Sequence, residues 1–136
     1  MDDVDVYAVV ADLRSRGIDV IRASYPDLIG VDRGRDVLID ELASVMGHGM
    51  AFCRAVYHTS PMGDVVPVQG GIEEGLPDVK AIPDLSTLTT MPWEEGVAWV
   101  IADTFDHDGD PAPESPRNVA RRGQHHGTTA GQSNCH

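Results

Sequence analysis

The chain has 136 residues and a mass of 14.6 kDa, a size that fits one domain with a modest core. Its formal net charge of −12 at pH 7 repels phosphate backbones and anionic lipid surfaces, so we expect neither nucleic acid nor a membrane as a partner. No apolar run reaches the roughly 20 residues of a membrane helix, and the acidic start MDDVD is unlike a secretory signal, so the expected location is cytoplasmic.

The first predicted element is a helix within residues 1–17. Its apolar residues recur at helical intervals, namely Val6, Val9, Val10 and Leu13. Gly17 follows them, and glycine is the usual residue of a left-handed C-terminal cap. Because aromatic residues make up only 5% of the chain, we expect the core to be aliphatic.

Residues 18–57 are expected to form a hairpin, a helix and an extended segment in that order. Residues 18–37 carry β-branched residues on both sides of a Pro-Asp turn, a pattern that predicts the hairpin. Residues 41–48, ELASVMGH, place apolar side chains on one helical face, and Asp40 is the expected N-cap. Residues 49–57, GMAFCRAVY, are expected to be extended.

The next two segments predict the rest of the sheet. Residues 78–93, DVKAIPDLSTLTTMPW, combine prolines with a Ser/Thr run and contain no pattern that does chemistry by itself. Residues 96–105, GVAWVIADTF, form an apolar run typical of a buried strand, and the Asp108-Gly109 pair that follows favours a tight turn. Because strand pairs alternate with single helices, we predict an α+β fold in which a helix packs across a small mixed sheet.

The charge balance changes at the C-terminal end. All 22 acidic residues lie at or before Glu114, so residues 1–116 carry 7 − 22 = −15 and the remainder +3. After the helical start RNVARR, residues 123–136 have no apolar face, and we expect a disordered tail. The tail's His and Cys residues are not assigned a metal, because a flexible segment lacks a supporting second shell. Cys53 and Cys135 are expected to be free thiols.

A search for chemical motifs assigns no catalytic residue and no metal ligand. The sequence has no phosphate-binding loop, dinucleotide fingerprint, HExxH or GxSxG pattern. The run DHDGD resembles the start of a calcium loop, but Pro111 stands where glycine is needed and Arg117 where a bidentate glutamate is needed. His48 and His58 could act as acids or bases, yet no partner is fixed for either, and surface positions are expected.

Four segments, taken in order, resemble the N-terminal domain of the glutamine synthetase family. They are VIRASYPDLIGVDRGRDV, LIDELASVMGHGMAF, DVKAIPDLSTLTTMPW and AWVIADTFDHDGDPAPESPRNVARR, and together they cover about residues 18–122. The family's motifs are an R-x-x-x-x-D-x-x-G hairpin, G-x-x-F after a helix, D-x-x-x-x-P-D-x-S-T with Pro-Trp, and D-G-x-P…P-R-x-x-x-x-R. The matching positions are Arg22, Asp27, Gly30, Gly49, Phe52, Asp78, Pro83, Asp84, Ser86, Thr87, Pro92, Trp93, Asp108, Gly109, Pro111, Pro116, Arg117 and Arg122.

The resemblance implies a β-grasp-like sheet for residues 18–122 and a parent enzyme that joins glutamate to an amine. Such an enzyme uses ATP and Mg²⁺ or Mn²⁺ to phosphorylate the γ-carboxylate before the amine displaces phosphate. The family's metal and phosphate ligands belong to its C-terminal catalytic domain, and this chain stops before that domain. We therefore expect a truncated product or short isoform that binds no cofactor and is not catalytic alone. Each family site forms against the catalytic domain of a neighbouring subunit, so alone this chain is expected to be a monomer or weak oligomer.

The resemblance also implies one segment of an amine pocket, the loop Phe52, Cys53, Arg54 and Ala55. Ammonium-using members carry Asp-Gly-Ser after the phenylalanine. A thiol is mostly neutral at pH 7 and Arg54 adds repulsion, so this loop disfavours ammonium. The long acidic segment before Asp78 is expected to attract a larger cation, as in the branch that glutamylates polyamines. The alternative is a free-standing acidic β-grasp interaction module.

Overall fold

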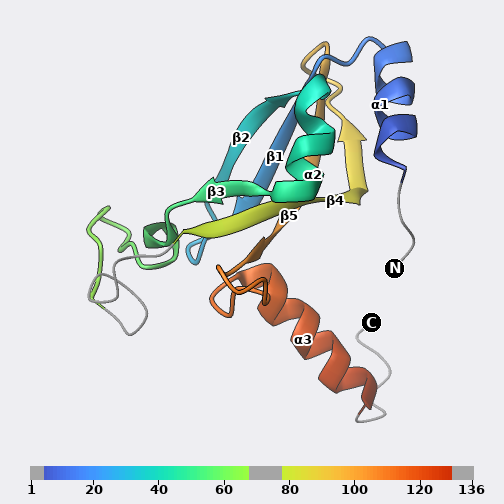
Figure 1. The fold of residues 1–136 in the computed structure, drawn as a ribbon. Helices are drawn as coiled ribbons and strands as arrows, with labels where there is room; N and C mark the ends of the chain where they lie inside the picture. The colour runs from blue at the N-terminus through green and yellow to red at the C-terminus, as the bar shows by residue number, and fades with distance from the viewer. Residues whose placement is uncertain (1–4, 68–77, 130–136) are drawn as a thin grey trace.

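A computed structural model describes residues 5–67 and 78–129 of the chain (Figure 1). Three α-helices and five strands are described, with two short 3₁₀ turns, η1 (Ile39–Glu41) and η2 (Arg54–Tyr57). In chain order they are α1 (Val6–Ser15), β1 (Val20–Pro26), β2 (Asp32–Leu38), α2 (Leu42–His48), β3 (Met50–Phe52), β4 (Val79–Thr90), β5 (Val97–Phe105) and α3 (Pro116–Thr129). Within the described ranges, no helix has the length and apolar character that a membrane span requires.

The five strands form one mixed sheet in the order β2-β1-β5-β4-β3. The central pair, β1 and β5, is parallel, with Val20 opposite Val97 and Ser24 opposite Ile101. The outer pairs are antiparallel. The hairpin places β2 at one edge of the sheet, beside β1. Helix α2 then leads to β3 at the other edge, and β4 and β5 bring the chain back beside β1, which is the β-grasp-like arrangement. The predicted α+β fold is confirmed.

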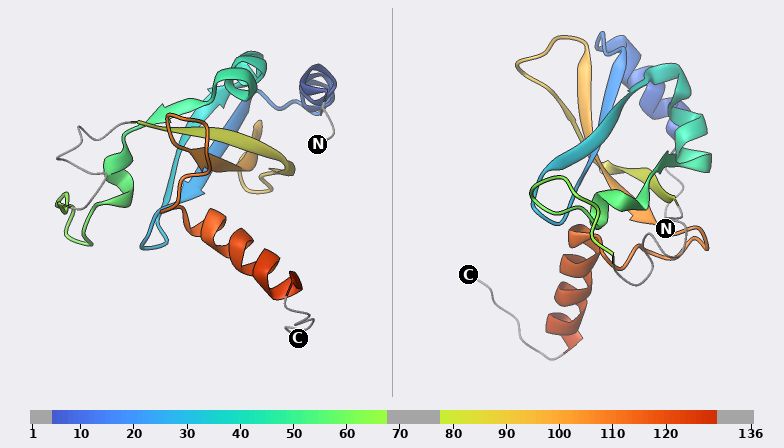
Figure 2. Two further views of the ribbon diagram at one scale, coloured as in Figure 1. Left: turned by 60° about the horizontal axis from the view of Figure 1, so that its bottom comes forward. Right: turned by 90° about the vertical axis from the view of Figure 1, so that its left-hand side faces the viewer.

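Helices α1 and α2 cover one face of the sheet (Figures 1 and 2). Leu13 of α1 and Leu42 of α2 are fully buried in one cluster with alternate residues of the central strands. On β5 the inward residues are Ala98, Val100, Ala102 and Thr104, each at most 1% exposed. The period of two puts Trp99, Ile101 and Asp103 on the opposite face. Neither α1 nor α2 covers that face.

The first helix and the hairpin agree with the sequence. Asp5 caps α1 by accepting from the backbone N–H groups of Tyr7 and Ala8 at 3.1 and 3.3 Å. Gly17 follows with φ of 76°, the left-handed conformation expected of a cap. The turn between β1 and β2 is held by the Asp27 carboxylate, so the second strand of the hairpin begins at Asp32.

Two predicted details are wrong. Asp40 does not cap α2: it lies in η1, which leads into the helix, and its carboxylate pairs with Arg14 of α1 instead. Residues 49–57 are extended only as far as Phe52, because the chain then turns into η2. Both differences depend on tertiary contacts that local sequence patterns do not carry.

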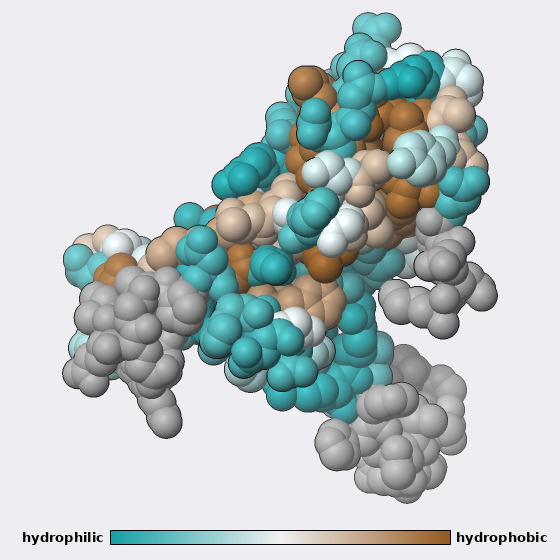
Figure 3. All heavy atoms as spheres, viewed as in Figure 1, coloured by the Kyte–Doolittle hydropathy of each residue, from teal (hydrophilic) through white to brown (hydrophobic). Residues whose placement is uncertain are grey.

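The C-terminal helix α3 runs further than expected. It continues past Arg122 to Thr129, so the first seven residues of the expected tail, 123–129, are helical. Residues 130–136, which include Cys135, lie outside the described residues, as do residues 68–77 of the acidic segment. Figure 2 shows α3 pointing away from the sheet, and Figure 3 shows that its visible surface is hydrophilic, whereas apolar residues gather between α1 and α2.

Candidate functional site

The predicted amine-pocket loop lies at the end of β3, on a small aromatic cluster. Phe52 is half-buried, and its ring meets Tyr25 edge-on with centroids 5.0 Å apart. Arg35 also contacts this ring: its guanidinium carbon lies over Phe52, 4.9 Å from the ring centroid. Tyr57 extends the cluster, 6.0 Å from Tyr25. The expectation of an aliphatic core is therefore wrong at this end of the domain, where Tyr25 and Tyr57 are buried beside Phe52.

Of the polar residues in the loop, Cys53 is exposed and Arg54 is turned inward. Arg54 is 8% exposed, and its Nη2 donates a hydrogen bond to Glu114 Oε1 at 2.7 Å. Because Glu114 neutralises the guanidinium, the repulsion expected from Arg54 is largely cancelled. Ala55 starts the η2 turn with Arg54 and is half-buried. The thiol of Cys53 is thus the one polar side chain of these four residues that is presented to solvent.

A buried hydrogen-bond chain fixes η2 against β5 and the start of α3. The Tyr57 hydroxyl lies 2.7 Å from Thr104 Oγ1, and both residues are almost fully buried. Burial raises the pKa of Tyr57, although its hydrogen bond to Thr104 opposes the rise, so the phenol stays protonated. Asn118 of α3 donates to the carbonyl oxygens of Thr104 and Ala112, each at 3.1 Å. The loop therefore rests on a rigid support.

The motif P-D-x-S-T in β4 has a structural role. The Asp84 carboxylate accepts from the backbone and the hydroxyl of Ser86, at 3.1 and 2.6 Å, and from Arg117 at 2.7 Å. Burial alone raises the pKa of Asp84, but these bonds and the Arg117 charge outweigh it and hold the pKa below its usual range. Thr87 accepts from the Ile101 N–H at 2.9 Å, where the register of β4 against β5 shifts. These residues shape an irregular strand and anchor α3.

The other sequence candidates do not converge into a second site. His48 is exposed, with Nδ1 3.2 Å from the Ser44 carbonyl oxygen. His58 is 7% exposed rather than at the surface as expected, and it lies directly after η2. The DHDGD run forms a tight turn in which Asp106 accepts from the Asp108 N–H at 3.0 Å. Among the side chains that the structure describes, those of residues 5–67 and 78–124, no three His, Cys, Asp or Glu come together to hold a metal.

Comparison with curated proteins identifies relatives that join glutamate to amines. No protein-family model matches the chain. The chain is 28% identical over 125 residues to the gamma-glutamylanilide synthase of Acinetobacter sp and 32% identical over 114 residues to the glutamate–isopropylamine ligase of Pseudomonas sp. It is 32% identical over 109 residues to the glutamine synthetase of Rhizobium meliloti (strain 1021). These alignments cover 84%, 81% and 80% of this chain but 25%, 25% and 22% of the relatives.

The fold comparison agrees with the sequence comparison. A solved GmaS/ADP complex matches with a TM-score of 0.68 and 27% identity, over 89% of this chain and 25% of that one. The chain therefore spans about a quarter of the length of its relatives. The shared quarter contains the hairpin, α2, the Phe52–Ala55 loop and the strand pair β4 and β5. In sequence and in fold, this chain belongs to the glutamine synthetase family and corresponds to its N-terminal region.

Proposed function

We propose that this domain supplies one wall of the amine pocket in an ATP-dependent glutamate–amine ligase. The catalytic groups come from the catalytic domain of a neighbouring subunit. The observation that carries the proposal is the exposed Cys53 at the end of β3, on a loop held by the Arg54–Glu114 ion pair. Two relatives support it: one is named for isopropylamine, and the other for γ-glutamylanilide, which is the amide of an aromatic amine.

The chemistry of this loop favours an organic amine over ammonium. An ammonium ion needs an anion to hold it and a base to accept its proton, and in the ammonium-using members a carboxylate after the phenylalanine meets that need. Here that position is Cys53, and the neighbouring guanidinium of Arg54 is occupied by Glu114. A polyamine, an alkanolamine or an alkylamine offsets the missing carboxylate by contacts along its carbon chain, which ammonium lacks.

The test is a chimaera in which residues 1–122 replace the corresponding quarter of the Pseudomonas ligase. We expect kcat/KM for isopropylamine or a polyamine to exceed that for ammonium. Replacing Cys53 with Asp is expected to shift the ratio toward ammonium by about tenfold, corresponding to roughly 1.4 kcal/mol of added attraction. The matched control is Tyr7→Asp, which adds a carboxylate on α1 at a position 76% exposed, and it is expected to leave the ratio unchanged.

Two outcomes would contradict this proposal. Efficient glutamine formation from ammonium, with no response to Cys53→Asp, would remove the amine argument while the family assignment stood. Micromolar binding of ATP·Mg²⁺ to the chain alone, measured by calorimetry, would contradict the assignment of the phosphate and metal ligands to another domain. An active chimaera would also argue against the alternative of a free-standing interaction module.

A further inference from the structure

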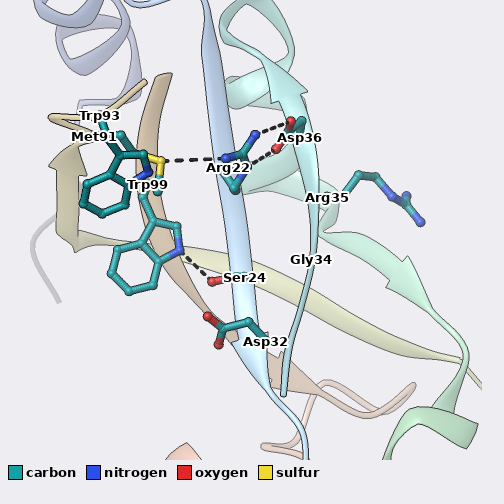
Figure 4. Close-up of a pocket in the computed structure, with 9 residues that line it drawn as sticks. All are labelled: Arg22, Ser24, Asp32, Gly34, Arg35, Asp36, Met91, Trp93 and Trp99. Carbon is teal, nitrogen blue, oxygen red and sulfur yellow. Dashed lines mark hydrogen bonds and ion pairs between the residues drawn. The ribbon is translucent and has the colours of Figure 1, made fainter. Parts of the chain in front are cut away.

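The open face of the sheet, opposite α1 and α2, carries a groove of about 660 Å³ (Figure 4). Both tryptophans of the chain line this groove together with the thioether of Met91. Trp93 is 77% exposed, although tryptophan is usually well covered. Trp99 is half-buried, and its indole N–H donates to Ser24 Oγ at 2.7 Å, which fixes the orientation of its ring. The groove therefore offers two aromatic surfaces, one of them rigid.

The positive charge in this groove is fully occupied. Arg22 makes two hydrogen bonds to Asp36, at 2.8 and 3.0 Å, and two to Glu94, at 2.7 and 3.3 Å. These three side chains together carry a net charge of −1. Arg35 also borders the groove, but Figure 4 shows its side chain pointing away, and its guanidinium lies over Phe52. Among the described residues that line the groove, no free cation faces the two tryptophans.

One carboxylate in the groove is unoccupied. Asp32 forms no hydrogen bond or ion pair with any side chain in the described parts of the domain, and Figure 4 shows its carboxylate directed toward Trp99. Asp32, Ser24 and Trp99 also border an adjoining hollow of about 520 Å³. Two arginines line that hollow: Arg117 pairs with Asp84 and Asp103, and Arg121 pairs with Asp103 at 3.3 Å, so both positive charges are occupied. Asp32 lies where the two hollows meet, with aromatic surface on one side.

We propose that this groove binds an organic cation, a quaternary or N-alkylated ammonium group on a small carbon skeleton. The faces of Trp93 and Trp99 attract the cation through the ring quadrupole, and indole is the best side chain for this contact. Asp32 supplies the counter-charge, and the Arg22–Asp36–Glu94 group adds a further negative charge nearby. An anion is repelled by this net charge, and a neutral ligand of the same shape gains no electrostatic attraction. This site does not depend on the proposed function.

The two tryptophans make the test local, because the chain has no others and any change in indole fluorescence reports on this groove. The probe is choline, titrated at constant ionic strength, and its neutral counterpart is 3,3-dimethylbutan-1-ol, which has the same shape without the charge. We expect a saturable fluorescence change with choline and at least tenfold weaker binding of the alcohol. Asp32→Asn is expected to weaken choline binding at least fivefold. Asp110→Asn, an exposed acid in the turn after β5 and outside the groove, is expected to leave it unchanged.

Three results would overturn the proposal: no saturable response to choline, equal affinity for the alcohol, or equal binding by the wild type and Asp32→Asn. Asp32 is exposed and its side chain forms no hydrogen bond or ion pair within the described residues, so its replacement is expected to leave the fold intact, which circular dichroism checks. A Trp93→Phe variant provides an independent reading by calorimetry. It is expected to retain binding with reduced affinity, because phenylalanine is a weaker partner for a cation than tryptophan. Unchanged affinity in this variant would also count against the groove.

Discussion

At the scale of single residues, Asp27 is the most heavily used carboxylate of the hairpin. Its side chain is 2% exposed, and Oδ1 accepts from the N–H groups of Ile29 and Val31 at 3.0 and 2.9 Å. Oδ2 accepts from Arg33 Nε at 3.0 Å. Burial by itself raises the pKa of Asp27, but the backbone bonds and the Arg33 charge outweigh it, so the pKa lies below its ordinary value of 3.8. The ionised form is the one that holds the turn.

We expect Asp27→Ala to lower the free energy of unfolding at pH 7 by about 2–3 kcal/mol, because it removes hydrogen bonds to a buried charge. Asp27→Asn keeps an oxygen for the two N–H groups and loses only the charge for Arg33, so a smaller loss is expected. Since the folded pKa is depressed, the stability due to ionised Asp27 is complete above pH 3.8 and disappears as pH falls through the folded pKa. Urea denaturation at pH 7 and at pH 3 measures this. An Asp27→Asn deficit that did not shrink at low pH would contradict the assignment.

Gly34 is required by the close approach of two strands. A Cβ at this position of β2 would overlap the carbonyl oxygen of Ala23 and lie 3.0 Å from Ser24 Cα, and backbone atoms cannot turn aside. We expect Gly34→Ala to destabilise the fold by about 1–3 kcal/mol. Gly47→Ala is the matched control: it lies inside α2 with nothing within 4 Å of the added carbon, and it is expected to stabilise by roughly 0.5–1 kcal/mol. Thermal unfolding of both variants compares the two effects.

At the scale of elements, α3 is attached to the sheet largely by charge. Arg117 pairs with Asp84 of β4 at 2.7 Å and with Asp103 of β5 at 3.0 Å, and Arg121 reaches Asp103 at 3.3 Å. Val119, an apolar residue of the helix, is 49% exposed, so it contributes little apolar burial to the attachment. Together with the hydrogen bonds of the buried Asn118, these ion pairs hold α3 against the sheet.

We expect Arg117→Gln to loosen α3 while leaving the sheet intact. Asp84 and Asp103 are 24% and 16% exposed, and loss of Arg117 leaves these two partly buried carboxylates with only the half-exposed Arg121 as a cation, at 4.0 and 3.3 Å. Hydrogen exchange is expected to accelerate in α3 and to stay slow in β1 and β5. The control is Arg122→Gln, which removes only a 3.1 Å bond to the Pro113 carbonyl oxygen. Equal exchange in the two variants would show that α3 is held by something else.

Sequence patterns predicted the elements and missed the contacts between them. The periods of α1 and β5 are local signals, and both elements form where their patterns indicated. The role of Asp84 was not predictable locally, because its partner Arg117 lies 33 residues further along the chain. The burial of Arg54 likewise depends on Glu114, 60 residues away. The motif order in the sequence identified the family, whereas the organic-cation groove required the sheet to bring Asp32 beside Trp99.

At the scale of the whole molecule, two features have opposite effects on self-association: the open face of the sheet favours it, and the net charge of −12 disfavours it. Trp93 exposes apolar surface that favours contact between copies, but at low salt the like charges of two chains repel. We expect light scattering to give a mass near 14.6 kDa in 50 mM salt. In 500 mM salt, where screening shortens the reach of the charges, weak association that increases with concentration is expected.

Trp93→Ser is expected to reduce this association. The control Tyr7→Ser, at an equally exposed position on α1, is expected to leave it unchanged. A stable ring-sized assembly at either salt concentration would contradict the expectation, since the like charges of the chains oppose the contacts that a closed ring requires.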